Sequence, residues 1–193
     1  HRWGDRKKLK KYRRRMDNLE DEIMHRQQIL HNRANRHWDT FLSLLEILQY
    51  FGSLKGTDLT EIGRTIASLR GDNELWLGLA LMSGHLDELV PSDLAAVIDG
   101  ISIEFNRPDV WCGYNSSPQS EEAVNDLSGI RRQLLREQER RNIDISILWN
   151  QELMALVEAW ARGVGWSELI ENTSLDEGDV VRIMRRTIDL LSQ

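Results

Sequence analysis

The sequence closes with Glu177-Gly-Asp-Val-Val-Arg-Ile-Met-Arg-Arg-Thr-Ile-Asp-Leu-Leu-Ser-Gln193, in which apolar residues recur every three or four positions. That spacing predicts one amphipathic helix over 177–193. The segment just before it, Ser174-Leu-Asp-Glu177, has the form of a capping box and is expected to start the helix. The side chains expected to face a core are Val180, Ile183, Met184, Ile188 and Leu191.

A polar row accompanies this apolar face. Arg182, Arg186 and Asp189 follow one another at i, i+4 and i+7, so they share one side of the helix, with Arg185 beside them. Guanidinium groups bind phosphate or stack on bases, and a carboxylate accepts a hydrogen bond from an exocyclic amine. The same spacing is typical of a solvated face in which Asp189 pairs with Arg185 or Arg186. Spacing alone favours the solvated face over nucleic-acid contact.

The composition predicts an all-α protein. The 193 residues include only three prolines, and long segments with helical periodicity dominate. We expect a helical bundle with winged-helix or helix-turn-helix-like segments, preceded by a long basic helix. Among these segments are a buried helix over 38–51 and a later helix over 145–163. The start at His1 indicates a fragment of a longer protein, and the absence of a run of 18 apolar residues predicts no membrane span.

Charge is distributed unevenly between residues 1–36 and 37–193, which we take as two parts of the chain. The first part has 12 Lys and Arg against 5 Asp and Glu, and the second has 13 against 26. Apolar residues in the first part step in a heptad pattern, which predicts a helix over about 5–36 that lies on another helix or domain. The candidate phosphate contacts in this helix are Lys7, Lys8, Lys10, Lys11, Arg13, Arg14 and Arg15.

No pattern in the chain points to catalysis. It has neither a phosphate-binding loop nor a Gly-x-Ser-x-Gly nucleophile elbow. The five histidines do not lie four residues apart beside acidic partners, and the single cysteine, Cys112, has no nearby histidine to act as a base. We therefore nominate no catalytic residue and no metal ligand, and expect this chain to be inactive as an enzyme on its own.

Two stretches resemble a known family. They are Arg70-Gly-Asp-Asn-Glu-Leu-Trp-Leu-Gly-Leu-Ala-Leu-Met-Ser-Gly84 and Leu175-Asp-Glu-Gly-Asp-Val-Val-Arg-Ile-Met-Arg-Arg186. Both are similar to the DSHCT domain, the C-terminal helical domain of the superkiller-type DExH-box RNA helicases. The resemblance covers residues 37–193, and the sequence of residues 70–84 is most like that of the cyanobacterial, plastid and actinobacterial branch of this family.

The resemblance implies a parent ATP-dependent RNA helicase. Two upstream RecA-like motor domains would use ATP and Mg, and this domain would guide single-stranded RNA past them, in a bacterial cytoplasm or a chloroplast stroma. Residues 177–193 match the family's ratchet helix, with its RNA-facing Arg at Arg186 and its acidic partner at Asp189. Arg182 lies one turn earlier, and the resemblance therefore favours RNA contact. The alternative function is a protein-interaction scaffold that docks a partner through the helix over 5–36.

Overall fold

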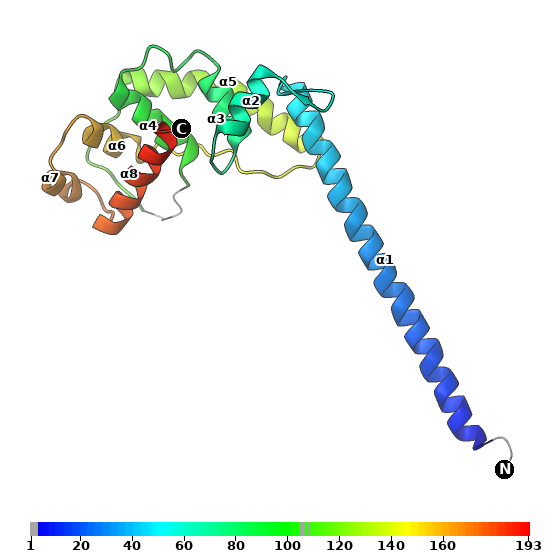
Figure 1. Ribbon diagram of the computed structural model, residues 1–193. Coiled ribbons are helices and arrows are strands. Elements are labelled where there is room, and N and C mark those ends of the chain that lie inside the picture. The colour runs from blue at the N-terminus through cyan, green and yellow to red at the C-terminus, as the bar shows by residue number, and fades with distance from the viewer. Residues whose placement is uncertain (1–3, 105–106, 108) are drawn as a thin grey trace. The chain divides into compact units, whose positions relative to one another are not determined.

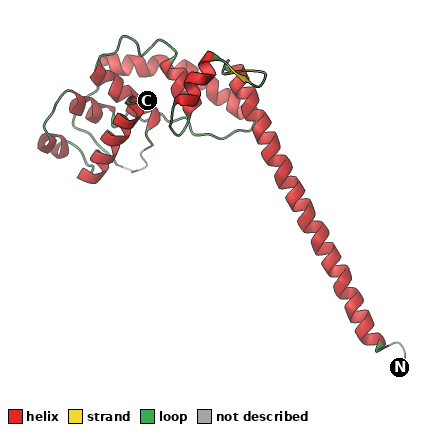
Figure 2. Ribbon diagram, in the orientation of Figure 1, coloured by secondary structure: helices red, strands yellow, loops and turns green. Residues whose placement is uncertain are grey.

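The computed structural model describes residues 4–104, 107 and 109–193, and Figures 1 and 2 show that it is mainly helical. A short antiparallel hairpin joins β1 (Leu54–Lys55) to β2 (Asp58–Leu59). The all-α prediction is confirmed. The helices are α1 (Arg6–Tyr50), α2 (Glu61–Ser68), α3 (Glu74–Leu81), α4 (Pro91–Ser102), α5 (Pro118–Arg140), α6 (Met154–Ala161), α7 (Trp166–Glu171) and α8 (Glu177–Leu191).

The chain divides into two compact units, residues 1–44 and 45–193. The predicted boundary between residues 36 and 37 falls inside α1, which is one uninterrupted helix.

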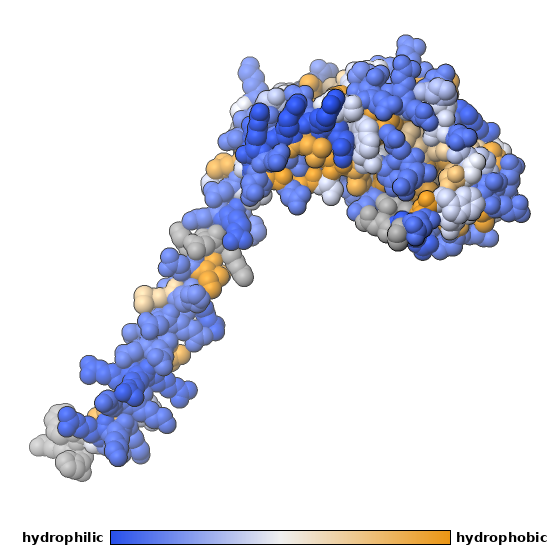
Figure 3. Space-filling model, turned by 180° about the vertical axis from the view of Figure 1, so that it is seen from behind, coloured by the Kyte–Doolittle hydropathy of each residue, from blue (hydrophilic) through white to orange (hydrophobic). Residues whose placement is uncertain are grey.

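The first unit is built from α1. Figure 3 shows hydrophilic side chains over most of this helix, with apolar ones between them. The apolar residues of the heptad pattern are largely exposed, from 50% at Leu19 to 65% at Leu30, because a single helix offers no second surface to cover them. They are Leu9, Tyr12, Met16, Leu19, Ile23 and Leu30. Trp38 and Phe41 are also exposed, so the prediction of a buried helix over 38–51 is wrong for this part.

In the second unit, the side chain of Thr60 connects the hairpin to the start of α2 by hydrogen bonds. Thr60 caps α2, because its side chain accepts a hydrogen bond from the Gly63 amide and donates one to the Gly52 carbonyl at 2.7 Å. Gly63 allows the helix to approach the hairpin closely. A Cβ at this position would lie 2.0 Å from the Ser53 carbonyl oxygen.

The core of the second unit forms around α4, which packs most extensively against α6 and also contacts α5 and α8 (Figure 1). Burial of these apolar side chains, at about 25 cal/mol per Å², is the main source of stability. One cluster joins α4, α6, α7 and α8 and consists of Ala95, Leu153, Leu156, Val157, Ala159, Leu169, Leu175, Val180, Ile183 and Met184.

A buried polar network ties three helices together. The carboxylates of Asp93 (α4) and Glu158 (α6) both bind Arg162 Nη2, at 3.1 and 2.6 Å. Ser117, which caps α5, donates its amide to Glu158 at 3.0 Å and its hydroxyl to Asp93 at 3.1 Å. Ser120 donates its hydroxyl to Glu158 at 3.0 Å. The two buried charges are therefore paired and hydrogen-bonded, which offsets the cost of their burial.

The predicted helix over 145–163 is wrong in its first half, because α6 begins only at Met154. Tertiary contacts hold the preceding residues in a non-helical conformation. The Asn150 amide donates to the Gly100 carbonyl at 2.7 Å, and the Trp149 ring lies 5.2 Å from the Arg131 guanidinium carbon. A cation–π contact and a backbone bond to α4 thus replace the helical pattern that the sequence suggested.

Candidate nucleic-acid interface

Helix α8 carries the site, and its N-cap lies two residues after the predicted one. Asp176, not Ser174, is the N-cap, and its carboxylate accepts a hydrogen bond from the Asp179 amide at 2.9 Å. This bond is the first cause of the lowered pKa of the Asp176 carboxyl group, and the nearby Arg107 lowers that pKa further.

The apolar face of α8 is buried only along its first half. Val180, Ile183 and Met184 are fully buried, as predicted. Ile188 and Leu191, which were also expected to face the core, are 46% and 44% exposed. The reason is that the core cluster to which α8 contributes ends at Met184.

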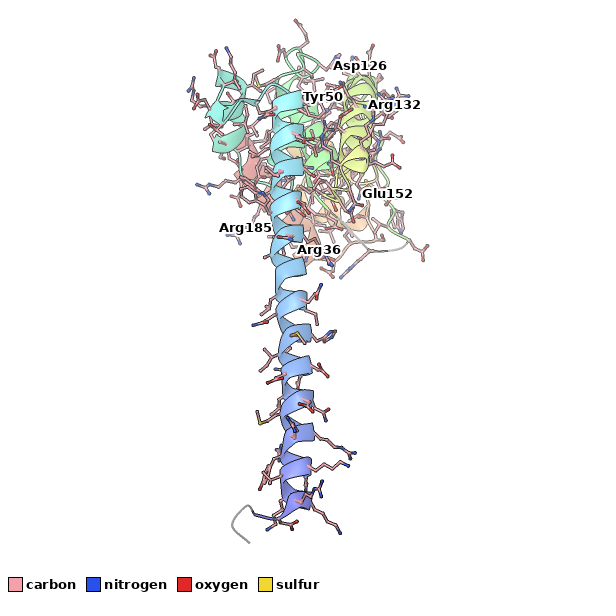
Figure 4. The ribbon with its side chains drawn as sticks, turned by 90° about the vertical axis from the view of Figure 1, so that its right-hand side faces the viewer. Arg36, Tyr50, Asp126, Arg132, Glu152 and Arg185 are labelled. Carbon is pink, nitrogen blue, oxygen red and sulfur yellow. The ribbon has the colours of Figure 1, made fainter. Side chains whose placement is uncertain are left out.

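The polar row lies on the solvent side of α8. Arg182, Arg185 and Asp189 are exposed, and Arg186 is partly exposed. Figure 4 shows the Arg185 side chain projecting from the surface. Within the helix, Arg182 Nη2 binds the Asp179 carboxylate at 2.7 Å. All four predicted RNA-contacting residues are thus accessible on one helix.

Arg186 pairs with Asp72 rather than with Asp189. Asp72 belongs to the loop before α3, and no local pattern predicts this contact, because the two residues are 114 positions apart. The same loop is bound a second time at the end of α8. Gln193 accepts from the Arg70 amide at 2.5 Å and donates to the Arg70 carbonyl at 3.0 Å. Residues 70–72 therefore border the polar row.

Behind Arg186 lies a buried acid, Asp99 of α4, which is 3% exposed. Burial raises the pKa of Asp99 to about 7, and the Thr187 hydroxyl and the positive charge of Arg186 oppose this increase only in part. One carboxylate oxygen of Asp99 has no hydrogen-bond partner among the described residues. Arg186 thus lies near two carboxyl groups, one at the surface and one in the core.

A fourth arginine joins the site at the start of α8. Arg107 binds Asp179 at 2.7 Å and Asp176 at 3.3 Å. The ion pairs Arg107–Asp179 and Arg186–Asp72 lie on one flank of α8, because residues 179 and 186 are seven positions apart. The guanidinium groups of Arg107, Arg182 and Arg186 each have a carboxylate partner, so this surface is much less cationic than its arginines suggest.

Such a surface suits base edges better than bare phosphates. Paired guanidiniums keep free N–H groups and a planar face, while their net attraction for a phosphate is reduced. The Asp189 carboxylate has no ion-pair partner among the residues that the structure describes, and it is able to accept a hydrogen bond from an exocyclic amine. Among the described residues there is no group of three or more His, Cys, Asp or Glu side chains that could hold a metal ion.

The seven candidate phosphate contacts in the first unit are exposed along α1. Lys7, Lys11 and Arg14 recur at i, i+4 and i+7, which places them in one row opposite the apolar residues Leu9 and Met16. These three side chains form a basic face opposite the apolar residues, whereas Arg13 lies next to Leu9 on the apolar side.

Comparison with known families decides the class of this chain. The model of the DSHCT (NUC185) domain matches residues 56–193. The chain belongs to the DSHCT domain family. Both the polar row of α8 and the Arg70–Asp72 loop lie inside the matched part of this DSHCT domain.

Three helicases are similar to the DSHCT domain described here. The chloroplastic DExH-box ATP-dependent RNA helicase DExH15 of Arabidopsis thaliana is 34% identical over 162 residues, which is 81% of this chain and 14% of that protein. The ATP-dependent RNA helicase mtr4 of Schizosaccharomyces pombe is 23% identical over 200 residues, or 96% of this chain and 17% of the relative. The probable helicase HelY of Mycobacterium leprae is 24% identical over 174 residues, which is 84% of this chain and 19% of that protein.

The predicted membership in the DSHCT domain of DExH-box RNA helicases is confirmed by this family match and these relatives. The chain covers less than a fifth of the length of each of these relatives. Within the described residues, no helix is both long enough and apolar enough to cross a membrane.

Proposed function

We propose that this chain is the RNA-contacting accessory domain of an ATP-dependent RNA helicase. Its α8 would guide single-stranded RNA past upstream RecA-like motor domains of the same polypeptide, where ATP and Mg would drive movement during RNA processing or decay. The observation that carries the proposal is the accessible row of Arg182, Arg185, Arg186 and Asp189 on a helix whose opposite face is fixed in the core. The proposed location is a bacterial cytoplasm or a chloroplast stroma.

Fixing the helix matters for the chemistry. Because Val180, Ile183 and Met184 are buried, the row does not need to be ordered when RNA binds, and less conformational entropy is lost. Arg182 and Arg186 would stack on bases or donate to them, and Asp189 would accept from an exocyclic amine. Each such contact would contribute on the order of 1–3 kcal/mol.

RNA must compete with Asp72 for Arg186. The side chains of both residues are about half exposed, so their ion pair is worth at most about 1 kcal/mol. A base stacked on the guanidinium contributes as much or more. Exchange of partners is therefore feasible without a change in the fold.

The basic face of α1 would supply the salt-dependent part of binding. Its row of lysines and arginines is able to neutralise phosphates, whereas the paired arginines of α8 add little net charge. On this proposal, substitution of α1 lysines lowers the slope of log Kd against log salt, and substitution of α8 arginines lowers affinity mainly at constant slope.

The direct test is a fluorescence-anisotropy titration of the chain with a labelled single-stranded oligoribonucleotide. Arg186→Ala and Arg182→Ala should each weaken binding about tenfold. Arg132→Ala is the matched control, because Arg132 projects from α5 into solvent (Figure 4). The parent helicase with Arg186→Ala should also unwind RNA more slowly. Unchanged affinity and unwinding for Arg186→Ala would refute the role proposed for this residue.

A second candidate function is supported by the exposed apolar stripe of α1. Leu9, Met16 and Leu30 are each more than half exposed, which is typical of a helix that packs on another helix. In that scaffold function, α1 docks a protein partner and RNA contact is incidental. The two functions differ in salt response, since RNA affinity falls steeply as salt rises and apolar docking does not.

A further inference from the structure

Residues 110–114 form a short extended strap beside the segment that leads into α8. The Trp111 amide donates to the Ser174 hydroxyl at 3.0 Å, and the Ser174 amide donates to the Trp111 carbonyl at 3.2 Å. Cys112 and Thr173 form an antiparallel β-bridge, and the Gly113 amide donates to the Asn172 carbonyl at 2.8 Å. The backbone of Trp111 is therefore fixed on the chain that precedes the Asp176 cap.

Side chains alternate along this strap, as they do in a strand. Val110, Cys112 and Tyr114 pack against the core cluster, so Trp111 between them faces outward. Its side chain is 54% exposed. A large aromatic ring is thus held in solvent on a backbone that cannot move it away.

The position of Trp111 extends the α8 site beyond the start of the helix. Ser174, which holds Trp111, lies two residues before Asp176, and Asp176 binds Arg107. Arg107 in turn binds Asp179, the partner of Arg182. A chain of contacts therefore runs from the Trp111 strap to the first arginine of the polar row.

The polar setting indicates what the ring contacts. Arg107, Ser174 and Asp176, which connect the strap to the helix, are exposed and polar, whereas a protein-docking site is expected to show a contiguous apolar patch. Proteins hold single-stranded nucleic acid with exposed aromatic side chains and basic residues along one binding surface, and the contacts described above link Trp111 to Arg107 and Arg182. The ring stacks on a base of any sequence, and the arginines contact the same strand.

We propose that the indole of Trp111 stacks on a base of the single-stranded RNA that the α8 row contacts. This inference rests on the proposed RNA contact of α8 and adds a binding residue at the N-terminal end of the helix. From Arg182 to Asp189 the row spans about 10 Å, at 1.5 Å per residue. Trp111 would hold the strand where it leaves this row.

The test uses the whole chain and short labelled oligoadenylate and oligouridylate strands, about 12 nucleotides long. Binding is measured by fluorescence anisotropy over a range of salt for wild type, Trp111→Ala, Trp111→Phe and Trp166→Ala. Trp166 is the matched control, because it is another exposed tryptophan (40%) of the same unit, at the start of α7. Thermal melts verify that the variants remain folded.

We expect Trp111→Ala to bind oligoadenylate about tenfold more weakly, with a smaller loss for oligouridylate. Trp111→Phe should recover most of this loss, because a phenyl ring also stacks. The slope of log Kd against log salt should not change, since the indole carries no charge. Trp166→Ala should bind like wild type.

Two results would overturn the inference in distinguishable ways. If Arg186→Ala weakens RNA binding but Trp111→Ala does not, the stacking role of Trp111 is wrong and the α8 site stands. If Arg186→Ala binds RNA like wild type, the proposed function of α8 fails, and the inference that rests on it fails too.

Discussion

Arg186 of α8 and Asp72 of the loop before α3 form an ion pair between residues 114 positions apart in the sequence. This contact makes the candidate RNA-contacting arginine part of a two-segment surface. The guanidinium is held in a defined position, but by a carboxylate that RNA has to displace. Asp72 therefore affects both the geometry and the affinity of the site.

Asp72→Asn should raise the affinity of the chain for single-stranded RNA a few-fold, because the guanidinium no longer has a charged competitor. Stability should change by less than about 1 kcal/mol, since the pair is half exposed. Anisotropy titrations and thermal melts measure the two quantities. Asp126→Asn on α5 is a control with the same chemistry at another exposed position (Figure 4). Weaker binding by Asp72→Asn would mean that Asp72 positions Arg186 instead of competing for it.

Asp99 should make the stability of the second unit depend on pH. Burial raises the pKa of its carboxyl group from 3.8 to about 7, so between these values the folded state binds a proton that the unfolded state does not. The free energy of unfolding should therefore fall as pH rises from about 4 to 7, by an amount on the order of a few kcal/mol. Urea unfolding of wild type and Asp99→Asn at pH 5 and pH 8 measures this. An equal pH dependence in both proteins would contradict the prediction.

Arg162→Ala should destabilise the chain strongly. It leaves the buried carboxylates of Asp93 and Glu158 without a cation, which costs about 3 kcal/mol. Arg26→Ala is the comparison, because its ion pair with Glu22 is exposed on α1 and contributes less than about 1 kcal/mol. Denaturant unfolding should separate the two variants clearly. Similar stabilities would show that hydroxyl and amide donors alone are sufficient for the network.

Two glycine substitutions should act in opposite directions. Gly63→Ala would place a Cβ 2.0 Å from the Ser53 carbonyl oxygen, and relief of this clash requires the hairpin to move away from α2. We expect a loss of roughly 1–3 kcal/mol. A Cβ at Gly129 of α5 would have no atom within 4 Å among those considered, so Gly129→Ala should stabilise the helix by about 0.5–1 kcal/mol. Melting temperatures that shift in the same direction for both variants would refute the role given to Gly63.

Local patterns in the sequence were sufficient for much of the fold. Helical spacing predicted α8 and its buried residues Val180, Ile183 and Met184 correctly. The cap of α2 by Thr60 is likewise a contact between near neighbours in the sequence. The family resemblance predicted the match to the DSHCT domain. It also singled out the arginines of α8 as candidate RNA contacts.

Periodicity failed where distant segments decided the conformation. Residues 145–153 have an apolar pattern, but bonds to Gly100 and contact with Arg131 hold them out of a helix. Ile188 and Leu191 continue the apolar stripe of α8, yet the core ends before them. A pattern states which face is apolar, whereas burial also requires a second surface to cover it.

The sequence by itself determined the helical class, the family and the accessible row of Arg182, Arg186 and Asp189, because helical spacing and motifs are local properties. Only the tertiary structure decided what surrounds that row. The tertiary structure pairs Arg186 with Asp72 and brings the buried Asp99 near the charge of Arg186. It also binds the Trp111 strap to the segment just before α8. These relationships depend on how α4, α8 and two loops pack together, and the free energy of that packing is shared among residues far apart in the chain.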